Sequence, residues 1–275
     1  MDNSHLLPIS SLAQLASAAP LCAGSIVGRR YILTAASCFK KQTDPTLYEI
    51  RIGDFNYAIN EQSEEIIAVS NVTFGRLYEG GGGGVATIRA ADDGLDVATD
   101  IALVELARDI PYQSAYVNEM CLPDMSTFAP TWTVNAFFFG WGEGGRTGLT
   151  SKSAPRYTTG NILSDENCNS VWGKENDTQL DQGRRICFES KSDSMKGVPC
   201  TGDEGGPLLL KFGTGTADDP ERLMQVGIYG ARDDTCSDQI PPVFTRITPY
   251  MRWINKQLAC TVPGVYYPVN CPMLQ

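Results

Sequence analysis

The sequence contains one histidine, His5, and no two cysteines spaced as Cys-x-x-Cys. Most protein zinc sites use histidines or such cysteine pairs, so we expect no metal or other cofactor. No apolar run approaches the roughly 20 residues of a membrane helix. Basic residues number 22 against 32 acidic ones, and the net charge is −10. Nucleic acids, heparin and anionic membranes bind basic protein surfaces. Because this chain is acidic, we do not expect any of the three as a partner.

The nine cysteines are dispersed along the chain, which is typical of disulfides formed in an oxidising compartment. Two N-glycosylation sequons agree with that interpretation, at Asn71-Val72-Thr73 and at Asn176-Asp177-Thr178. We therefore expect a secreted, extracellular protein with disulfide bonds, and we name Asn71 and Asn176 as its candidate glycosylation sites.

Short runs of β-forming residues alternate with turn-rich segments, which predicts an antiparallel sandwich or barrel. The runs lie at 25–35, 49–52, 65–72, 101–106, 132–140, 207–212, 223–229 and 243–247. One helix is predicted near the C-terminus, where Thr248 and Pro249 precede apolar residues at helical spacing. Residues 6–20 resemble a signal peptide superficially, but they lack a basic start, so a strand is the preferred interpretation.

Three segments occur in a characteristic order: Tyr31-Ile-Leu-Thr-Ala-Ala-Ser-Cys38, Asp100-Ile-Ala-Leu-Val104 and Gly202-Asp-Glu-Gly-Gly-Pro207. They resemble the L-T-A-A-H-C, D-I-A-L and G-D-S-G-G-P segments of trypsin-like serine proteases. Cys22-Ala-Gly-Ser-Ile26 and Phe139-Gly-Trp-Gly142 resemble further segments of that family. The resemblance covers residues 10–258, and it rests on the ordered set of segments.

The resemblance implies an all-β fold of two antiparallel Greek-key six-stranded β-barrels with a C-terminal helix. The protease-homologue domain would span 1–258, with the N-terminal barrel at 10–115, the C-terminal barrel at 120–247 and the helix at 249–259. Residues 260–275 would form a tail, in which Cys260 and Cys271 could close a small disulfide loop.

The family also implies particular disulfides. The implied pairs are Cys22–Cys38, Cys168–Cys187 and Cys200–Cys236. Cys121 matches a position that often tethers an N-terminal segment, and together with Cys260 and Cys271 it leaves one cysteine to pair outside the chain or stay free. Because residues 6–20 are interpreted as a strand, a signal peptide is expected upstream of this sequence, and whether an N-terminal domain also precedes it stays open.

The catalytic positions of the family are altered here. The resemblance places Ser37 at the histidine position and Glu204 at the nucleophilic serine, and only the aspartate, Asp100, is retained. A serine hydroxyl cannot serve as a general base near neutral pH, and a carboxylate attacks amides poorly. The backbone N–H groups of Gly202 and Glu204 would form the oxyanion hole, which we expect the Glu204 carboxylate to fill. Acid-protease chemistry by Glu204 and Asp100 is the less favoured alternative.

Other family sites depart as well. The resemblance places Val198 at the base of the primary specificity pocket, where trypsin-like enzymes carry aspartate. No activation site precedes the first barrel, so Asp203 needs hydrogen-bond partners other than a newly cut N-terminus. The segment with Asp54, Asn60, Glu61 and Glu64 resembles a calcium loop, but it is short, and we expect a solvated acidic turn.

These observations favour a binding protein over an enzyme. We expect a pseudo-protease that binds active serine proteases or their zymogen substrates, as a cofactor or regulator of a protease cascade of the innate-immunity or melanisation type. As a protease homologue without the catalytic histidine and serine, it resembles the arthropod clip-domain protease homologues. The alternatives are an inhibitor or decoy that binds another hydrolase, and a serine-type endopeptidase as the fold alone would suggest.

Overall fold

The computed structural model describes most of both predicted barrels. The described residues are 12–17, 19–39, 44–53, 56, 64–75, 100–111, 117–123, 135–142, 155–176, 183–190, 199–213, 222–231 and 240–259. Among them, no helix is both long enough and apolar enough to cross a membrane.

Six antiparallel strands form the first barrel. They are β1 (Leu12–Ser17), β2 (Ala19–Gly28), β3 (Tyr31–Thr34), β4 (Glu49–Ile52), β5 (Glu65–Phe74) and β6 (Ala102–Leu106). The order β1-β2-β3-β6-β5-β4 closes through pairing of β1 with β4. Ile26, Ile32 and Ile50 are buried inside, and burying each such side chain contributes about 1.5–3 kcal/mol. The predicted strand within residues 6–20 is confirmed by β1 and the start of β2.

The run predicted at 25–35 is two strands rather than one. β2 ends at Gly28, a turn follows at Arg29 and Arg30, and β3 begins at Tyr31. Both arginines form ion pairs with Asp109, at 2.9 Å and 2.7 Å. The run of β-forming residues is thus interrupted by a turn at the paired arginines, which the sequence favours as solvated loop residues.

The second barrel repeats the topology of the first. Its strands are β7 (Asn135–Gly140), β8 (Arg156–Ile162), β9 (Arg185–Ser190), β10 (Pro207–Phe212), β11 (Arg222–Ala231) and β12 (Val243–Arg246). Pairing of β10 with β7 closes it. Phe138, Tyr229 and Phe244 pack against one another inside, with ring centroids 5.5–5.7 Å apart. The predicted fold class of two six-stranded barrels is confirmed.

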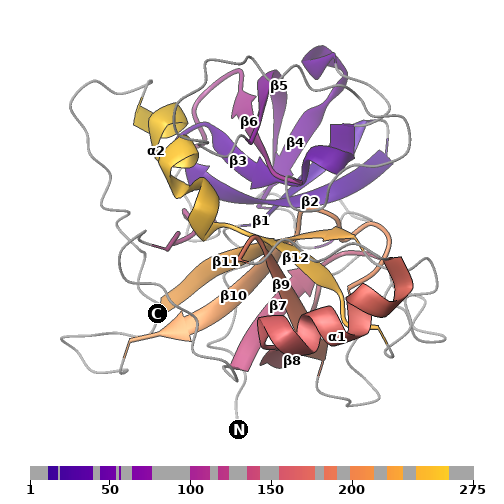
Figure 1. Cartoon of the computed structure of the whole chain (residues 1–275). Coiled ribbons are helices and arrows are strands. Elements are labelled where there is room, and N and C mark those ends of the chain that lie inside the picture. Colours follow the sequence, from indigo (N-terminus) through magenta and orange to yellow (C-terminus); the bar gives the residue numbers. More distant parts are fainter. Residues whose placement is uncertain are drawn as a thin grey trace, which may run out of the picture.

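The barrels share one apolar cluster where they meet. Leu33 of β3 packs there with Leu209 of β10 and Ile228 of β11, and all three are completely buried. Figure 1 shows the first barrel above the second, with β2 beside the strands of the second barrel. Loops that converge on this junction are therefore held by both barrels.

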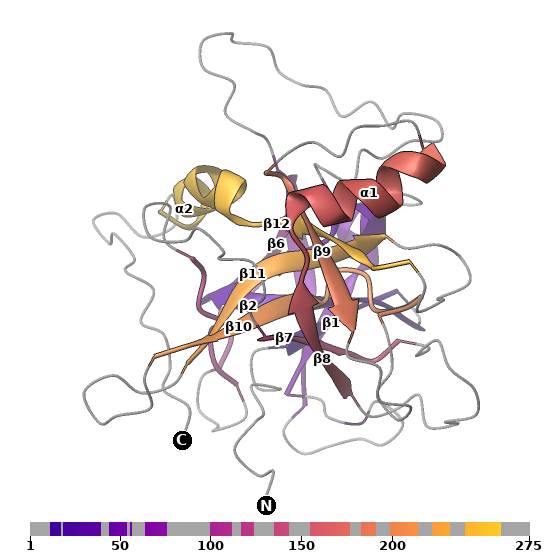
Figure 2. The ribbon, with the colours of Figure 1, turned by 60° about the horizontal axis from the view of Figure 1, so that its bottom comes forward.

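Among the described residues there are two α-helices, α1 beside the second barrel and α2 beside the first in Figure 1, with β12 between them in both views (Figures 1 and 2). The C-terminal one begins as a 3₁₀ turn at Thr248–Tyr250 and continues as α2 (Met251–Ala259), so regular α-helix starts two residues later than predicted. The Tyr250 N–H donates to the Ile247 carbonyl at 2.8 Å, which sets the tighter turn. Ile254 and Leu258 bury its apolar face, as predicted.

The helix α1 (Asp165–Asn176) was not predicted. Its sequence is largely polar, so it shows no apolar stripe at helical spacing. Cys168 is buried and forms a disulfide with Cys187 of β9, and Arg246 of β12 pairs with Asp165 at 3.2 Å. Contacts with distant strands, rather than an amphipathic pattern, hold this helix in place.

Candidate functional site

The loop before β10 consists of two tight turns. The Asp203 N–H donates to the Cys200 carbonyl, and the Gly206 N–H donates to the Asp203 carbonyl, each at 2.9 Å. Gly202 and Gly205 have φ of +90° and +83°, in the left-handed region that favours glycine. A Cβ on Gly205 would also overlap the Ala23 carbonyl oxygen. Glycine is therefore required at this position by both backbone conformation and space.

Asp203 anchors this loop to the second barrel. Its carboxylate is 4% exposed and accepts the Gly142 N–H at 2.7 Å and the Cys200 N–H at 3.0 Å. A Cβ on Gly140 or on Gly142 would collide with this carboxylate, so the glycines around Trp141 make room for it. Backbone N–H groups thus hydrogen-bond to Asp203, which the sequence analysis expected to need partners other than a newly cut N-terminus.

The Glu204 side chain turns back onto its own loop. Its Oε2 accepts the Gly202 N–H at 2.7 Å, and the side chain is only partly exposed. Burial raises the pKa of Glu204 above its ordinary value, while hydrogen bonds from the backbone N–H groups of Glu204 and Gly202 oppose that rise. The carboxylate therefore occupies the Gly202 N–H, one of the two donors that the resemblance assigns to an oxyanion hole.

Asp100 and Ser37 form the other half of the site. Ser37 lies in the 3₁₀ helix Ala36–Phe39 after β3, and Asp100 lies just before β6. The Ser37 N–H donates to Asp100 Oδ1 at 2.6 Å, and the Ser37 hydroxyl lies 2.9 Å from Oδ2. Asp100 is 2% exposed, and its carbonyl accepts the Thr245 hydroxyl of β12 at 3.0 Å. Both barrels therefore position this carboxylate.

A short chain of contacts joins the two halves. Cys38, which follows Ser37, forms a disulfide with Cys22 of β2. The next residue, Ala23, donates its N–H to the Glu204 carbonyl at 2.7 Å and accepts the Thr34 hydroxyl at 2.7 Å. A disulfide of this kind stabilises a fold by about 2–4 kcal/mol. Ser37, Asp100 and Glu204 are thus brought to one junction between the barrels.

Comparison with known families agrees with this architecture. Residues 3–254 match the trypsin family.

The chain belongs to the trypsin family.

Its relatives in that family include named proteases. Serine protease 41 of Homo sapiens is 26% identical over 245 residues, which cover 88% of this chain and 70% of that protein. CLIP domain-containing serine protease B15 of Anopheles gambiae is 28% identical over 252 residues, covering 86% and 61%. Urokinase-type plasminogen activator of Gallus gallus is 25% identical over 247 residues, covering 86% and 51%. This trypsin-family chain therefore matches between 51% and 70% of the length of these relatives.

Some residues that the sequence analysis named lie outside the described residues. These are His5, Asp54, Asn60, Glu61, Val198, Cys236, Cys260 and Cys271. Cys121 and Cys200 are disulfide-bonded, but the structure describes neither partner. The implied pairs Cys22–Cys38 and Cys168–Cys187 are present.

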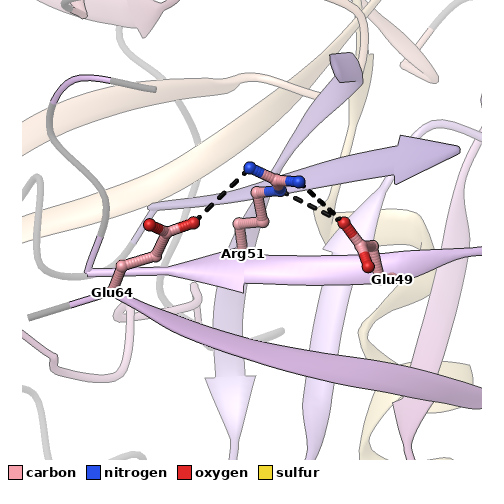
Figure 3. A network of polar contacts seen from close by, with 3 residues as sticks. All are labelled: Glu49, Arg51 and Glu64. Carbon is pink, nitrogen blue, oxygen red and sulfur yellow. Dashed lines mark hydrogen bonds and ion pairs between the residues drawn. The ribbon is translucent and has the colours of Figure 1, made fainter. Parts of the chain in front are cut away.

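Glu64 belongs to an ion-pair network on the first barrel (Figure 3). The Arg51 guanidinium lies 3.5 Å from Glu64 and 2.9 Å from Glu49. Among the described residues, no group of three or more histidine, cysteine or acidic side chains is arranged to hold a metal ion. The solvated acidic turn stays a prediction, since only Glu64 of the four named residues is described.

Sequence reasoning missed three contributors to the site of this trypsin-family chain. They are the Ala23 backbone, the Thr34 hydroxyl and the Gly142 N–H. All three fall within or beside segments that carry the family resemblance. Ala23 contacts Glu204 and Gly142 contacts Asp203, and each pair is separated by more than 60 residues of sequence. A local sequence pattern does not reveal contacts between such distant residues.

Proposed function

We propose that this chain is a catalytically inactive trypsin-family protease homologue that is secreted and acts by binding other proteins. The observation that carries the proposal is the hydrogen bond of 2.7 Å from the Gly202 N–H to the Glu204 carboxylate. It supports a site whose anion-binding N–H groups already hold a side chain of the protein itself.

The first argument concerns the general base. Peptide hydrolysis by this fold needs an imidazole that takes a proton from the nucleophile and returns it to the leaving amine. Ser37 holds that position, and its hydroxyl donates to the Asp100 carboxylate. A hydroxyl cannot take up a proton near neutral pH, so Ser37 and Asp100 together provide no base.

The second argument concerns the nucleophile and the oxyanion hole. Glu204 presents a carboxylate where the family presents a hydroxyl, and a carboxylate is a poor nucleophile toward amides. The developing oxyanion of a substrate would also need the Gly202 N–H, which the Glu204 carboxylate accepts already. A bound peptide would therefore meet both negative charge and an occupied donor.

The partner class is inferred from resemblance and charge. We infer that the partners are secreted proteins, namely active serine proteases or their zymogens, within a cascade of the innate-immunity or melanisation type. The mosquito relative bears the name of a CLIP-domain protease, which favours this class. The disulfides support secretion. The net charge of −10 argues against nucleic acid. Inhibition of another hydrolase is the second candidate within the same binding class.

Affinity capture tests the binding function. The folded chain, immobilised with its disulfides intact, would be incubated with extracellular fluid of its source organism, beside a reduced and alkylated sample of the same chain. We expect the folded chain alone to retain trypsin-family proteases or zymogens, identified by mass spectrometry. Equal recovery of such proteins by both samples, or recovery of none, would refute the proposed partner class.

A further inference from the structure

Strand β5 carries the sequon Asn71-Val72-Thr73 on the first barrel. Along the first part of this strand, buried and exposed residues alternate. Ile67 and Val69 face the core, and Ile66 and Ala68 face solvent. Continued alternation would turn Asn71 toward the core, where an attached sugar could not fit.

A β-bulge reverses that outcome. Val69 pairs with Leu106 and Asn71 pairs with the adjacent residue Glu105, so Ser70 is an extra residue in the strand. The Ser70 hydroxyl donates to the Glu105 carbonyl at 3.0 Å, which holds the bulge. Asn71 is consequently exposed.

Beyond the bulge, the alternation resumes in the opposite phase. Val72 and Phe74 pack against the core cluster of the first barrel. Asn71 therefore lies on the outer surface of the barrel, and nothing within the described residues hydrogen-bonds to its side chain. The strand thus presents the acceptor amide to solvent, which a folded glycoprotein requires.

We propose that Asn71 carries an N-linked oligosaccharide. The Asn71 Nδ2 forms a bond to the anomeric carbon of an oligosaccharide linked to a lipid diphosphate. The bond from that carbon to the diphosphate oxygen breaks, the amide loses one proton, and the lipid diphosphate leaves. Thr73 supplies the hydroxyl that the sequon requires. This step rests on the proposed secretion, because secretory compartments supply the lipid-linked donor.

The topology also determines where the sugar points. In the closed order β1-β2-β3-β6-β5-β4, β5 is three strands from β2 in either direction, and so lies across the barrel from it. Strand β2 carries Ala23, which contacts Glu204. Figure 1 shows β5 on the side of the first barrel away from β10, β11 and β12. The glycan therefore shields the outer face of β5, including Ile66, which is 47% exposed, and leaves the junction site open.

The test uses the full chain, secreted from eukaryotic cells behind a leader peptide. The variant Asn176→Gln leaves one sequon, and peptide:N-glycosidase treatment should increase its electrophoretic mobility and convert Asn71 to aspartate in the peptide mass spectrum. Thr73→Ala should abolish both changes, whereas Thr73→Ser should retain them. Asn71 found unmodified in secreted wild-type chain would overturn the proposal.

Capture of partner proteins before and after removal of the glycan tests glycosylation at Asn71 separately from the proposed binding function. Enzymatic removal of the glycan should leave capture of partner proteases unchanged, because the sugar lies across the barrel from the junction site. Loss of capture on deglycosylation would overturn the placement of the glycan. Absence of partner capture from glycosylated chain would count against the binding function alone, since the mass spectrum decides the modification independently.

Discussion

Replacement of Gly205 by alanine probes how the Glu204 loop docks on the first barrel. Gly205 has φ of +83°, and its Cβ would overlap both the Ala23 carbonyl oxygen and the Thr34 hydroxyl. Gly183 is the matched control, because its φ is +86° and a Cβ there would meet nothing within 4 Å. The two substitutions therefore share the backbone penalty and differ only in the clash.

The magnitudes follow from these contacts. The left-handed conformation costs an alanine about 1–2 kcal/mol, which applies to both variants. At Gly205 the clash also disrupts the hydrogen bonds from Thr34 to Ala23 and from Ala23 to Glu204, each worth about 0.5–1.5 kcal/mol. We expect a loss of roughly 1–2 kcal/mol for Gly183→Ala and roughly 2–5 kcal/mol for Gly205→Ala.

Thermal unfolding followed by circular dichroism, with the disulfides intact, measures the difference. For a domain of about this size, each kcal/mol shifts the Tm by roughly 2–4 °C. Gly205→Ala should therefore melt several degrees below Gly183→Ala. Equal melting temperatures for the two variants would refute the close docking of Gly205 on Ala23.

Two further predictions concern the carboxylates of the same loop. Because burial raises the pKa of Glu204 above its ordinary value of 4.5, the folded state holds that proton more tightly than the unfolded state. The free energy of unfolding should consequently fall as pH rises from about 4.5 through the raised pKa, and urea titrations of Glu204→Gln should lack this component. Parallel pH profiles for wild type and Glu204→Gln would contradict the buried environment. Asp203→Ala leaves the buried Gly142 and Cys200 N–H groups without their charged acceptor, so it should lower the free energy of unfolding by at least about 3 kcal/mol. The surface control Asp109→Ala should change it little, and a similar small effect at Asp203 would show that the carboxylate does not anchor the loop.

The barrels could be predicted because the ordered segments around Tyr31, Asp100 and Gly202 resemble a known family over most of the chain. The apolar stripe of α2 was predictable from spacing alone. The turn at Arg29 and Arg30 agrees with the expectation that paired arginines are solvated, although the β-forming run around them continues on both sides. The helix α1 was missed because its polar sequence carries no stripe, and contacts with β9 and β12 stabilise it.

Some features of the site could also be predicted from the sequence, and others could not. Ser37, Asp100 and Glu204 could be selected from sequence, since each lies within a recognisable segment. The direction of the Glu204 side chain could only be hypothesised, because it depends on the turn at Gly202 and on the hydrogen bond from the Gly202 N–H. The outward orientation of Asn71 was inaccessible, since a single extra residue at Ser70 decides it through pairing with a distant strand.

Labelling with a fluorophosphonate, which reacts covalently with activated serines, combined with hydrolysis of a broad peptide library, measures whether this chain has protease activity. The comparison is between wild type and the double variant Ser37→His, Glu204→Ser, with Asp100→Asn as a further control. We expect neither labelling nor cleavage by the wild-type chain. Wild-type cleavage that Glu204→Gln or Asp100→Asn abolishes would refute the proposed inactivity and indicate acid–base catalysis by these two carboxylates.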